Sequence, residues 1–256
     1  MGYFLSYQFM IAIIGAGING LALGYELQKR NIPYQILEAT QRVGGCINSQ
    51  KVEKYWLELG PNSLLCNAEV NKVINEIGLR DQVIEANEIS NSRYIFKKGR
   101  YQKLPAKPQQ LLFSPFFSFK TKLAVFREFR NKSKGSKDET LSSFFRRRFS
   151  QEVVDYPLNT FVAGIYAGDP DKLLLRKAFP VLKRYEEEYG SILRGFIKNK
   201  TGERRQSVSF QKGIAQLPRT MAEKLNIRLQ TPVQSISKNE NGRFILQLPE
   251  GETLEA

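Results

Sequence analysis

The alternation of apolar and polar residues predicts a β-α-β unit at the start of the chain. Residues 9–14 form an apolar run with the length and β-branched content of a buried parallel strand. Apolar positions with helical spacing follow and end near Asn31, and residues 34–37 are predicted to form a second strand. The first part of the chain is therefore predicted to have an α/β fold.

Three glycines lie between this strand and this helix, in the spacing G-x-G-x-x-G. Gly15 permits a tight turn, Gly17 lets a pyrophosphate approach bare backbone, and Gly20 lets the helix pack closely on the strand. The N–H groups at the helix start would face the phosphates. Glu38, eighteen positions after Gly20, is placed to accept a hydrogen bond from a ribose hydroxyl. This pattern predicts dinucleotide binding.

The residues after Glu38 favour FAD over a nicotinamide nucleotide. Gly44 and Gly45 directly follow the second strand, and Arg42 offers a cation to the phosphates. A flavin dinucleotide is longer, and its ring end must also be approached by backbone. The alternative is that the glycine pair is an ordinary turn and that Arg42 is solvated.

The middle of the chain is predicted to be mainly helical. Residues 67–79 form an amphipathic helix that Gly78 ends, and residues 93–104 form a hairpin. Further helices are predicted after the cap Thr140 and through residues 151–166 and 173–198. The run Arg146-Arg147-Arg148 is interpreted as a solvated helix face, and the acidic run at residues 186–188 as surface.

Residues 111–130 combine many phenylalanines with lysines and arginines. One interpretation is a helix in the core of a second domain, with its lysines in water. The other is a surface seated in a membrane interface, where phenylalanines are buried and basic groups meet anionic headgroups. A nucleic-acid surface is a third and weaker alternative, because no known nucleic-acid module accompanies it.

The end of the chain is predicted to return to the first domain. Strands are expected at residues 207–210, 227–229, 233–236 and 244–248, with a helix at residues 214–225. The pair Asn241-Gly242 predicts a hairpin. The predicted domains are residues 10–90 and 207–256 for nucleotide binding, interrupted by a helical domain at residues 91–206.

Composition narrows the chemistry. The 256 residues carry a formal charge of +14, which predicts an acidic partner such as nucleic acid, anionic lipid or a carboxylate-bearing substrate. The sequence has no histidine, which excludes Ser-His, Cys-His and His-metal chemistry, so a bound cofactor would carry any difficult step. Cys46 and Cys66 have no metal-ligand spacing and indicate a reduced, cytoplasmic protein.

The first nine residues have neither a basic n-region nor a cleavage site, so they are not expected to be a signal peptide. Met10 directly precedes the first strand and is the expected native start. No stretch holds the roughly twenty uninterrupted apolar residues that a spanning helix needs.

Seven motifs, in order, carry a resemblance to a known family. They are GAGINGL, LEATQRVGG, ELGPNSLL, NSRYIFKKGRYQKLP, DETLSSFFRRRFS, FVAGIYAGDPDKL and SFQKGIAQLPRTMAEKL. The chain resembles the protoporphyrinogen oxidase family, within the monoamine-oxidase-like FAD oxidoreductases. The resemblance implies a cofactor site made of Gly15, Ala16, Gly17, Ile18, Asn19, Gly20, Glu38, Ala39, Arg42, Gly44, Gly45, Gly60, Pro61, Asn62, Ser63 and Val233.

The resemblance also implies an activity, the oxidation of a porphyrinogen to a porphyrin with dioxygen as acceptor in haem biosynthesis. Arg93 would hold a propionate, the backbone at Gly164 would meet the substrate, and the backbone at Val233 would meet the adenine. The alternatives are an exposed strand cation at Arg93, a helix-packing glycine at Gly164 and simple strand packing at Val233.

The resemblance further implies peripheral attachment to a membrane through the helical middle, and a homodimer is considered. Asn19 stands where the family usually has serine. Because the chain ends at Ala256, we expect the C-terminal part of the fold to be missing. Coproporphyrinogen oxidation, oxidation of an amine or polyene, and a non-catalytic membrane-surface binder remain as alternatives.

Overall fold

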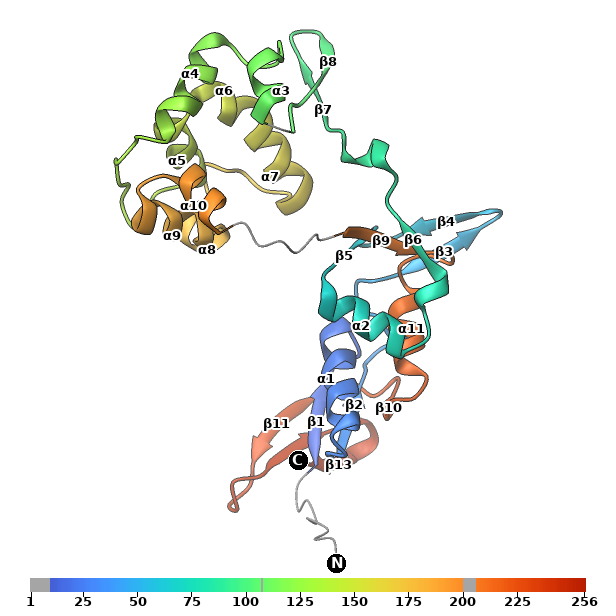
Figure 1. Ribbon diagram of the computed structural model, residues 1–256. Coiled ribbons are helices and arrows are strands. Elements are labelled where there is room, and N and C mark those ends of the chain that lie inside the picture. The colour runs from blue at the N-terminus through green and yellow to red at the C-terminus, as the bar shows by residue number, and fades with distance from the viewer. Residues whose placement is uncertain (1–9, 107, 200–205) are drawn as a thin grey trace, which may run out of the picture. The chain divides into compact units, whose positions relative to one another are not determined.

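The computed structural model describes residues 10–106, 108–199 and 206–256 (Figure 1). The chain divides into two compact units. Unit 1 consists of Met1–Ala86 and Glu203–Ala256, and unit 2 consists of Asn87–Gly202.

Unit 1 contains the predicted β-α-β unit. Strands β1 (Ile11–Ile14) and β2 (Tyr34–Leu37) pair in parallel, and helix α1 (Ile18–Lys29) connects them. Strand β10 (Ile227–Arg228) pairs in parallel with the other side of β2. β2 is therefore central and almost fully buried, which explains its continuous apolar character.

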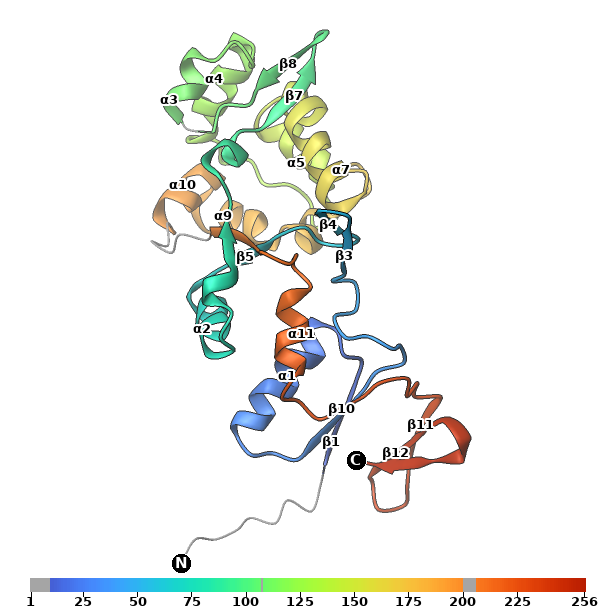
Figure 2. The ribbon, with the colours of Figure 1, turned by 90° about the vertical axis from the view of Figure 1, so that its right-hand side faces the viewer.

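A second sheet and two helices complete the core of unit 1. Strand β9 (Gln206–Phe210) lies between β5 (Leu64–Cys66) and β6 (Val83–Glu85) and is antiparallel to both. Helices α2 (Ala68–Glu76) and α11 (Gln216–Ala222) carry buried side chains of the same core, and α11 lies beside α1 (Figure 2). The 3-10 turn at Arg80–Gln82 precedes β6.

Two further β elements belong to unit 1. Strands β3 (Ser49–Val52) and β4 (Tyr55–Glu58) form a hairpin that the sequence did not predict. Strands β11 (Ser235–Lys238), β12 (Phe244–Gln247) and β13 (Thr253–Glu255) form an antiparallel sheet, with a 3-10 turn at Pro249–Gly251. The hairpin predicted at Asn241-Gly242 is confirmed, and Gly242 has a φ of +80°. The strand predicted at residues 233–236 is shifted, because it begins only at Ser235.

Unit 2 begins with a 3-10 turn (Glu88–Asn91) and a hairpin of β7 (Tyr94–Lys97) and β8 (Arg100–Lys103), which confirms the predicted hairpin. The rest is helical. The helices are α3 (Pro108–Phe113), α4 (Phe119–Glu128), α5 (Leu141–Arg148), α6 (Gln151–Val153), a π-helical segment (Val154–Leu158), α7 (Asn159–Tyr166), α8 (Leu175–Ala178), α9 (Pro180–Tyr189) and α10 (Ile192–Lys198). Leu141, Phe144 and Val162 lie at the centre of its core.

Helix ends follow the capping signals of the sequence. The Asn67 side chain accepts a hydrogen bond from the backbone N–H of Val70, and Gly78 ends that segment with a φ of +78°. The hydroxyl of Thr140 accepts from the N–H of Ser143, which confirms the predicted cap of α5.

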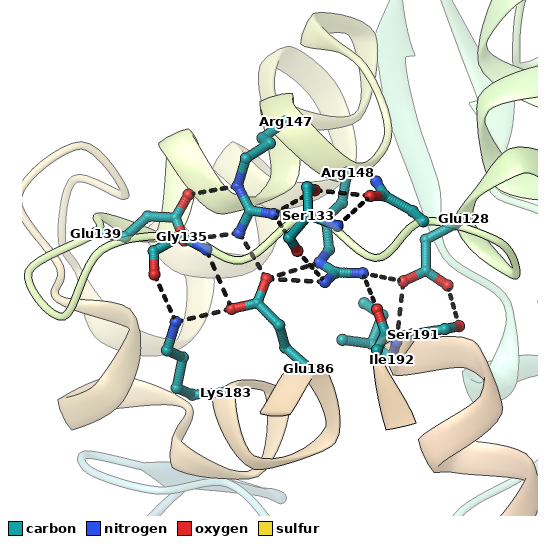
Figure 3. A network of polar contacts seen from close by, with 12 residues as sticks. Glu128, Ser133, Gly135, Glu139, Arg147, Arg148, Lys183, Glu186, Ser191 and Ile192 are labelled. Carbon is teal, nitrogen blue, oxygen red and sulfur yellow. Dashed lines mark hydrogen bonds and ion pairs between the residues drawn. The ribbon is translucent and has the colours of Figure 1, made fainter. Parts of the chain in front are cut away.

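The interpretation of residues 146–148 as a solvated face is wrong for two of the three arginines. The side chain of Arg148 is fully buried and that of Arg147 is 24% exposed, and only Arg146 is largely in water. The interpretation of Glu186 as surface is also wrong, because its side chain is fully buried against Arg147 and Arg148 (Figure 3). Carboxylates brought from helices distant in sequence allow these guanidinium groups to be buried.

Residues 111–130 combine features of both leading interpretations. Phe116 is buried in unit 2, whereas Phe113 and Phe119 are 87% and 81% exposed. Within the described parts of the chain, no helix is both long and apolar enough to cross a membrane.

Candidate functional site

The turn between β1 and α1 has open space above it. Gly15 has a φ of +96°, and its N–H donates to the carbonyl oxygen of Leu37 at 2.7 Å. Among the described residues, a Cβ atom on Gly15 or Gly17 would meet no atom within 4 Å, and no side chain caps the start of α1. The backbone of this turn can therefore be approached by a ligand, as the sequence predicted.

Gly20 has a different role, which is also the predicted one. A Cβ atom there would lie 2.0 Å from the carbonyl oxygen of Gly15 and 3.3 Å from Cγ2 of Ile13. The first turn of α1 thus packs directly on the strand, and this contact fixes the shape of the open turn.

Glu38 lies at the end of β2 beside this turn. One carboxylate oxygen accepts from the N–H of Ala16 at 2.7 Å, and the other accepts from the N–H and hydroxyl of Thr40 at 2.9 and 2.8 Å. Burial of Glu38 would raise its pKa, but the hydrogen bonds from Thr40 and Ala16 outweigh burial and lower the pKa. Glu38 is therefore an ionised acceptor at neutral pH. The sequence did not single out Thr40, although a hydroxyl two positions after an acid is a common local donor.

The second glycine pair packs against the first turn. The N–H of Gly44 donates to the carbonyl oxygen of Ala16 at 2.8 Å, and Gly44 forms a parallel bridge with Gly17. A Cβ atom on Gly45 would lie 3.3 Å from Cα of Gly17. Gly44 and Gly45 are thus part of one structure with the first turn. The Arg42 side chain is exposed, and in the described part of the chain its hydrogen bonds are long ones, of 3.5 Å to the backbone oxygens of Val43 and Ile47.

Gly60 packs against the backbone at Cys46, directly after Gly45. A Cβ atom on Gly60 would lie 1.9 Å from the carbonyl oxygen of Cys46, so only glycine allows these two segments to approach. Pro61, Asn62 and Ser63 follow and are exposed. The structure therefore brings the Gly-Pro-Asn-Ser segment beside Gly45.

A buried brace that the sequence did not reveal holds this segment. The hydroxyl of Ser49 lies 2.5 Å from a Glu58 oxygen and accepts from the N–H of Ala215 at 2.9 Å. The other oxygen of Glu58 accepts from the N–H of Ile214 at 2.9 Å. Two motifs far apart in the sequence thus meet here. The sequence carried no signal for this contact, because Ser49 and Glu58 lie on a hairpin that it did not predict.

The remaining predicted cofactor residues of unit 1 lie near the end of β2 and the start of α1. Val233 is half-buried outside any strand and packs against the cluster of Leu37, Leu246 and Leu248, and nearby Thr231 donates its N–H to the carbonyl oxygen of Glu38 at 2.8 Å. Ala39 is exposed. In the first turn of α1, Ile18 is half-buried and Asn19 is exposed.

The two predicted substrate residues belong to unit 2. Arg93 directly precedes β7, is exposed, and donates from Nη1 to the carbonyl oxygen of Ser90. Gly164 lies in α7 and is exposed, and a Cβ atom there would meet no atom within 4 Å. Among the described residues, nothing packs against the Cα of Gly164.

These features fit a flavin dinucleotide in unit 1. The open backbone at Gly15 and Gly17, the uncapped start of α1 and the ionised Glu38 match the diphosphate and ribose of such a ligand. No group of three or more metal-ligating side chains occurs among the described residues.

Comparisons with known proteins agree with this site. The family of flavin containing amine oxidoreductases matches residues 18–256. The chain is 34% identical over 262 residues to protoporphyrinogen oxidase 2, chloroplastic/mitochondrial, of Arabidopsis thaliana, covering 91% of this chain and 51% of that protein. It is 30% identical over 244 residues to coproporphyrinogen III oxidase of Bacillus subtilis (strain 168), covering 89% and 50%. The chain thus spans about half the length of these relatives.

Solved structures show the same fold. A crystal structure of a candidate protoporphyrinogen oxidase from Exiguobacterium sp. 255-15 matches 97% of this chain and 58% of its own, with a TM-score of 0.72 at 24% identity. Putrescine oxidase bound to putrescine matches 97% and 57%, with a TM-score of 0.60 at 17% identity. With a family match over nearly its whole length, the chain belongs to the flavin containing amine oxidoreductases, whose cofactor is FAD.

Proposed function

We propose that this chain carries the FAD cradle of an oxygen-dependent protoporphyrinogen oxidase, which converts protoporphyrinogen IX to protoporphyrin IX. The observation that carries the proposal is the open backbone at Gly15 and Gly17 beside the ionised carboxylate of Glu38. The similarity to the Arabidopsis enzyme over 91% of this chain supports the choice of substrate.

Each part of the cradle would hold one part of FAD. Backbone N–H groups of Gly17, Ile18, Asn19 and Gly20 would bind the diphosphate, helped by the dipole of α1. Glu38 would accept from a ribose hydroxyl through the oxygen bonded to Ala16, because that oxygen keeps a second lone pair, whereas the other oxygen already accepts two hydrogen bonds from Thr40.

The remaining cofactor residues would complete the contacts. The cation of Arg42 would approach the phosphates, and backbone at Ala39 and Val233 would border the adenine end. Gly44, Gly45 and the segment Gly60, Pro61, Asn62 and Ser63 would border the flavin end. Bound FAD would supply the acceptor for hydride equivalents and pass electrons to dioxygen.

Unit 2 would orient the substrate. A porphyrinogen carries propionates, and Arg93 is exposed with guanidinium nitrogens available beyond the one bonded to Ser90. The exposed backbone face at Gly164 would allow the flat edge of a macrocycle to approach α7. Without histidine in the chain, positioning is the main contribution of these residues.

The domain assignment is part of the same proposal. Residues 10–90 and 207–256 would form the FAD-binding domain and residues 91–206 the helical substrate domain. β1 has only β2 as a partner among the described strands, and its Ile11 and Ile14 are 40% and 54% exposed. A further strand would be able to hydrogen-bond to the backbone of β1 at this edge.

Contact with an anionic membrane is proposed through unit 2, where α4 exposes Phe119 and Phe126 beside basic residues. A cytoplasmic location and a homodimer stay predictions from the sequence.

The test compares two arginine variants of one hairpin. The purified chain should show flavin absorbance. Arg93→Ala should keep the flavin but lower porphyrinogen-dependent reduction of the bound flavin at least tenfold, whereas the matched control Arg100→Ala, exposed on β8, should change neither. If Arg93→Ala loses bound flavin and porphyrinogen-dependent flavin reduction to the same extent, Arg93 does not belong to the substrate site. A colourless chain that stays colourless when refolded with FAD would contradict the proposed function.

Coproporphyrinogen III is the second candidate substrate, favoured by the 30% identity to the Bacillus subtilis enzyme. Flavin reduction measured with both porphyrinogens, at equal concentrations, decides between them. Faster reduction by coproporphyrinogen would replace the substrate that we propose.

A further inference from the structure

A strongly basic cavity lies on unit 2. Its volume is about 500 Å³, and it lies between the end of α4 and the turn that joins α9 to α10. Four of its lining side chains are cations: Arg130, Lys132, Lys134 and Arg194. No carboxylate lines the cavity, and within the described residues none of these four side chains makes a hydrogen bond or ion pair.

A buried polar network fixes one wall of this cavity. The carbonyl oxygen of Ser133 accepts from Nη1 of Arg147 at 3.0 Å and from Nη2 of Arg148 at 2.8 Å (Figure 3). Ser133 lies between Lys132 and Lys134 in the sequence. The loop that carries these two lysines is therefore fastened to the buried guanidinium groups.

The same network fixes a second part of the lining, at Gly190 and Arg194. Arg148 donates to the carbonyl oxygen of Gly190 at 3.0 Å. Glu128 accepts from the hydroxyl of Ser191 at 2.6 Å and from the N–H of Ile192 at 2.9 Å (Figure 3). These bonds hold the start of α10, which carries Arg194. Arg130 follows Glu128 by two residues, so both ends of the cavity depend on this carboxylate.

The network does not neutralise the cavity. Its own cations and carboxylates pair with each other: Arg147, Arg148 and Lys183 with Glu128, Glu139 and Glu186. The positive charges around the cavity are thus held close together and left uncompensated. Like charges in a fixed concave site attract an anion, and guanidinium and ammonium groups together suit a phosphate.

An exposed apolar stripe leads to this cavity. Phe119, Leu123 and Phe126 of α4 are 81%, 37% and 53% exposed, and their spacing of four and three residues places them on one helical face. Arg130 continues the same spacing and lines the cavity. On α10, Phe196 is 51% exposed. A helix of a soluble domain normally turns such a stripe inward, so this face is suited to an apolar environment.

We propose that this cavity binds the phosphate of an anionic lipid headgroup, while the stripe of α4 enters the acyl boundary. The inference rests on the membrane contact proposed above and gives it a specific site. The stripe favours a lipid over a free phosphate, because a soluble anion would need no apolar surface beside it.

The test measures binding of the purified chain to phosphatidylcholine vesicles with and without 30% phosphatidylglycerol. A pocket variant replaces the four lining cations by serine, at Arg130, Lys132, Lys134 and Arg194. A control variant of equal net charge replaces four exposed lysines of unit 1 by serine, at Lys51, Lys54, Lys212 and Lys224. The pocket variant should bind anionic vesicles at least tenfold more weakly, and the control should lose less than threefold. If the pocket variant fails to fold, Lys132→Ser/Lys134→Ser, on an exposed loop, replaces it.

Each other outcome would overturn the inference. Equal weakening of both variants would show that net charge alone attracts the chain to the vesicles. If the unsubstituted chain binds no vesicles, the proposed membrane contact is ruled out. Glycerol phosphate, added at millimolar concentration, and duplex DNA serve as competing anions. If either one binds the cavity more tightly than the vesicles do, the ligand of the cavity is a different anion. Flavin absorbance of the pocket variant should be unchanged, so a failure of lipid binding is separable from a failure of the proposed enzyme function.

Discussion

Arg148 and Glu186 form an ion pair that is closed off from solvent inside unit 2. Their side chains are both fully buried, and Nη2 of Arg148 lies 2.8 Å from Oε1 of Glu186. The same guanidinium reaches Glu128 at 2.7 Å, so one cation serves two buried carboxylates. Because each buried charge depends on the others, removing one leaves an uncompensated charge in a poorly hydrated site.

Arg148→Met should lower the free energy of unfolding of unit 2 by about 3–5 kcal/mol, since Glu128 and Glu186 would stay buried without their shared cation. Chemical denaturation followed by near-ultraviolet circular dichroism measures the change. Arg146→Met is the matched control on the same helix, because the Arg146 side chain is 49% exposed, and it should cost less than about 1 kcal/mol. Equal effects of both variants would show that the buried network adds little stability.

Unit 2 should lose stability in acid. Burial of Glu186 would raise its pKa, but hydrogen bonds from Lys183, Arg147 and Arg148 outweigh burial and lower the pKa from its usual 4.5 to about 2. A carboxyl group whose pKa is lowered by folding contributes its full stabilisation at pH values above its pKa in the unfolded chain. For Glu186, this stabilisation is lost as the pH falls from about 4.5 to about 2. The denaturation midpoint should therefore fall over this range.

Glu186→Gln is the control for this pH dependence. The amide cannot titrate, so the variant should be less stable at pH 7 and its midpoint should depend less on pH between 4.5 and 2. A variant with the same acid profile as the unsubstituted chain would show that other carboxylates dominate. Glu152 would be the next to test, since its pKa is also lowered to about 2: its burial is outweighed by hydrogen bonds from Lys97, Thr121 and Ser118.

Two glycine variants separate folding from cofactor binding in unit 1. Gly20→Ala should destabilise the unit by about 1–3 kcal/mol, because the added Cβ would lie 2.0 Å from the backbone oxygen of Gly15. Gly17→Ala should leave the melting temperature unchanged but weaken FAD at least tenfold, because its Cβ would enter the open space where a diphosphate would lie. Retained FAD affinity in a folded Gly17→Ala chain would place the diphosphate elsewhere.

Local patterns predicted the elements that depend on neighbouring residues. β2 was predicted at its observed bounds, and the glycine stop after α2 and the cap of α5 were identified, because strand burial and helix ends are decided within a few positions. The β-α-β unit and the roles of Gly15 and Gly20 follow from the same local geometry.

Contacts between distant segments could not be predicted in this way. Arg148 lies 38 positions from Glu186, and nothing in a run of three arginines indicates that two of them have buried partners. The hairpin β3–β4 was missed because its strands are largely exposed and show no apolar alternation. Likewise, the close approach of Gly60 to Cys46 depends on how that hairpin folds back.

The brace between Ser49 and Glu58 provides the last prediction. Ser49 is 3% exposed and bonds both Glu58 and the N–H of Ala215. Ser49→Ala would leave this N–H and one carboxylate oxygen without their partner, which should cost about 1–3 kcal/mol of stability. Because Gly60 follows Glu58 by two residues, FAD affinity should also fall. Ser237→Ala, exposed on β11, is the control and should change neither the melting temperature nor FAD affinity. Lost stability with unchanged FAD affinity would show that the Gly60 segment does not contact the cofactor.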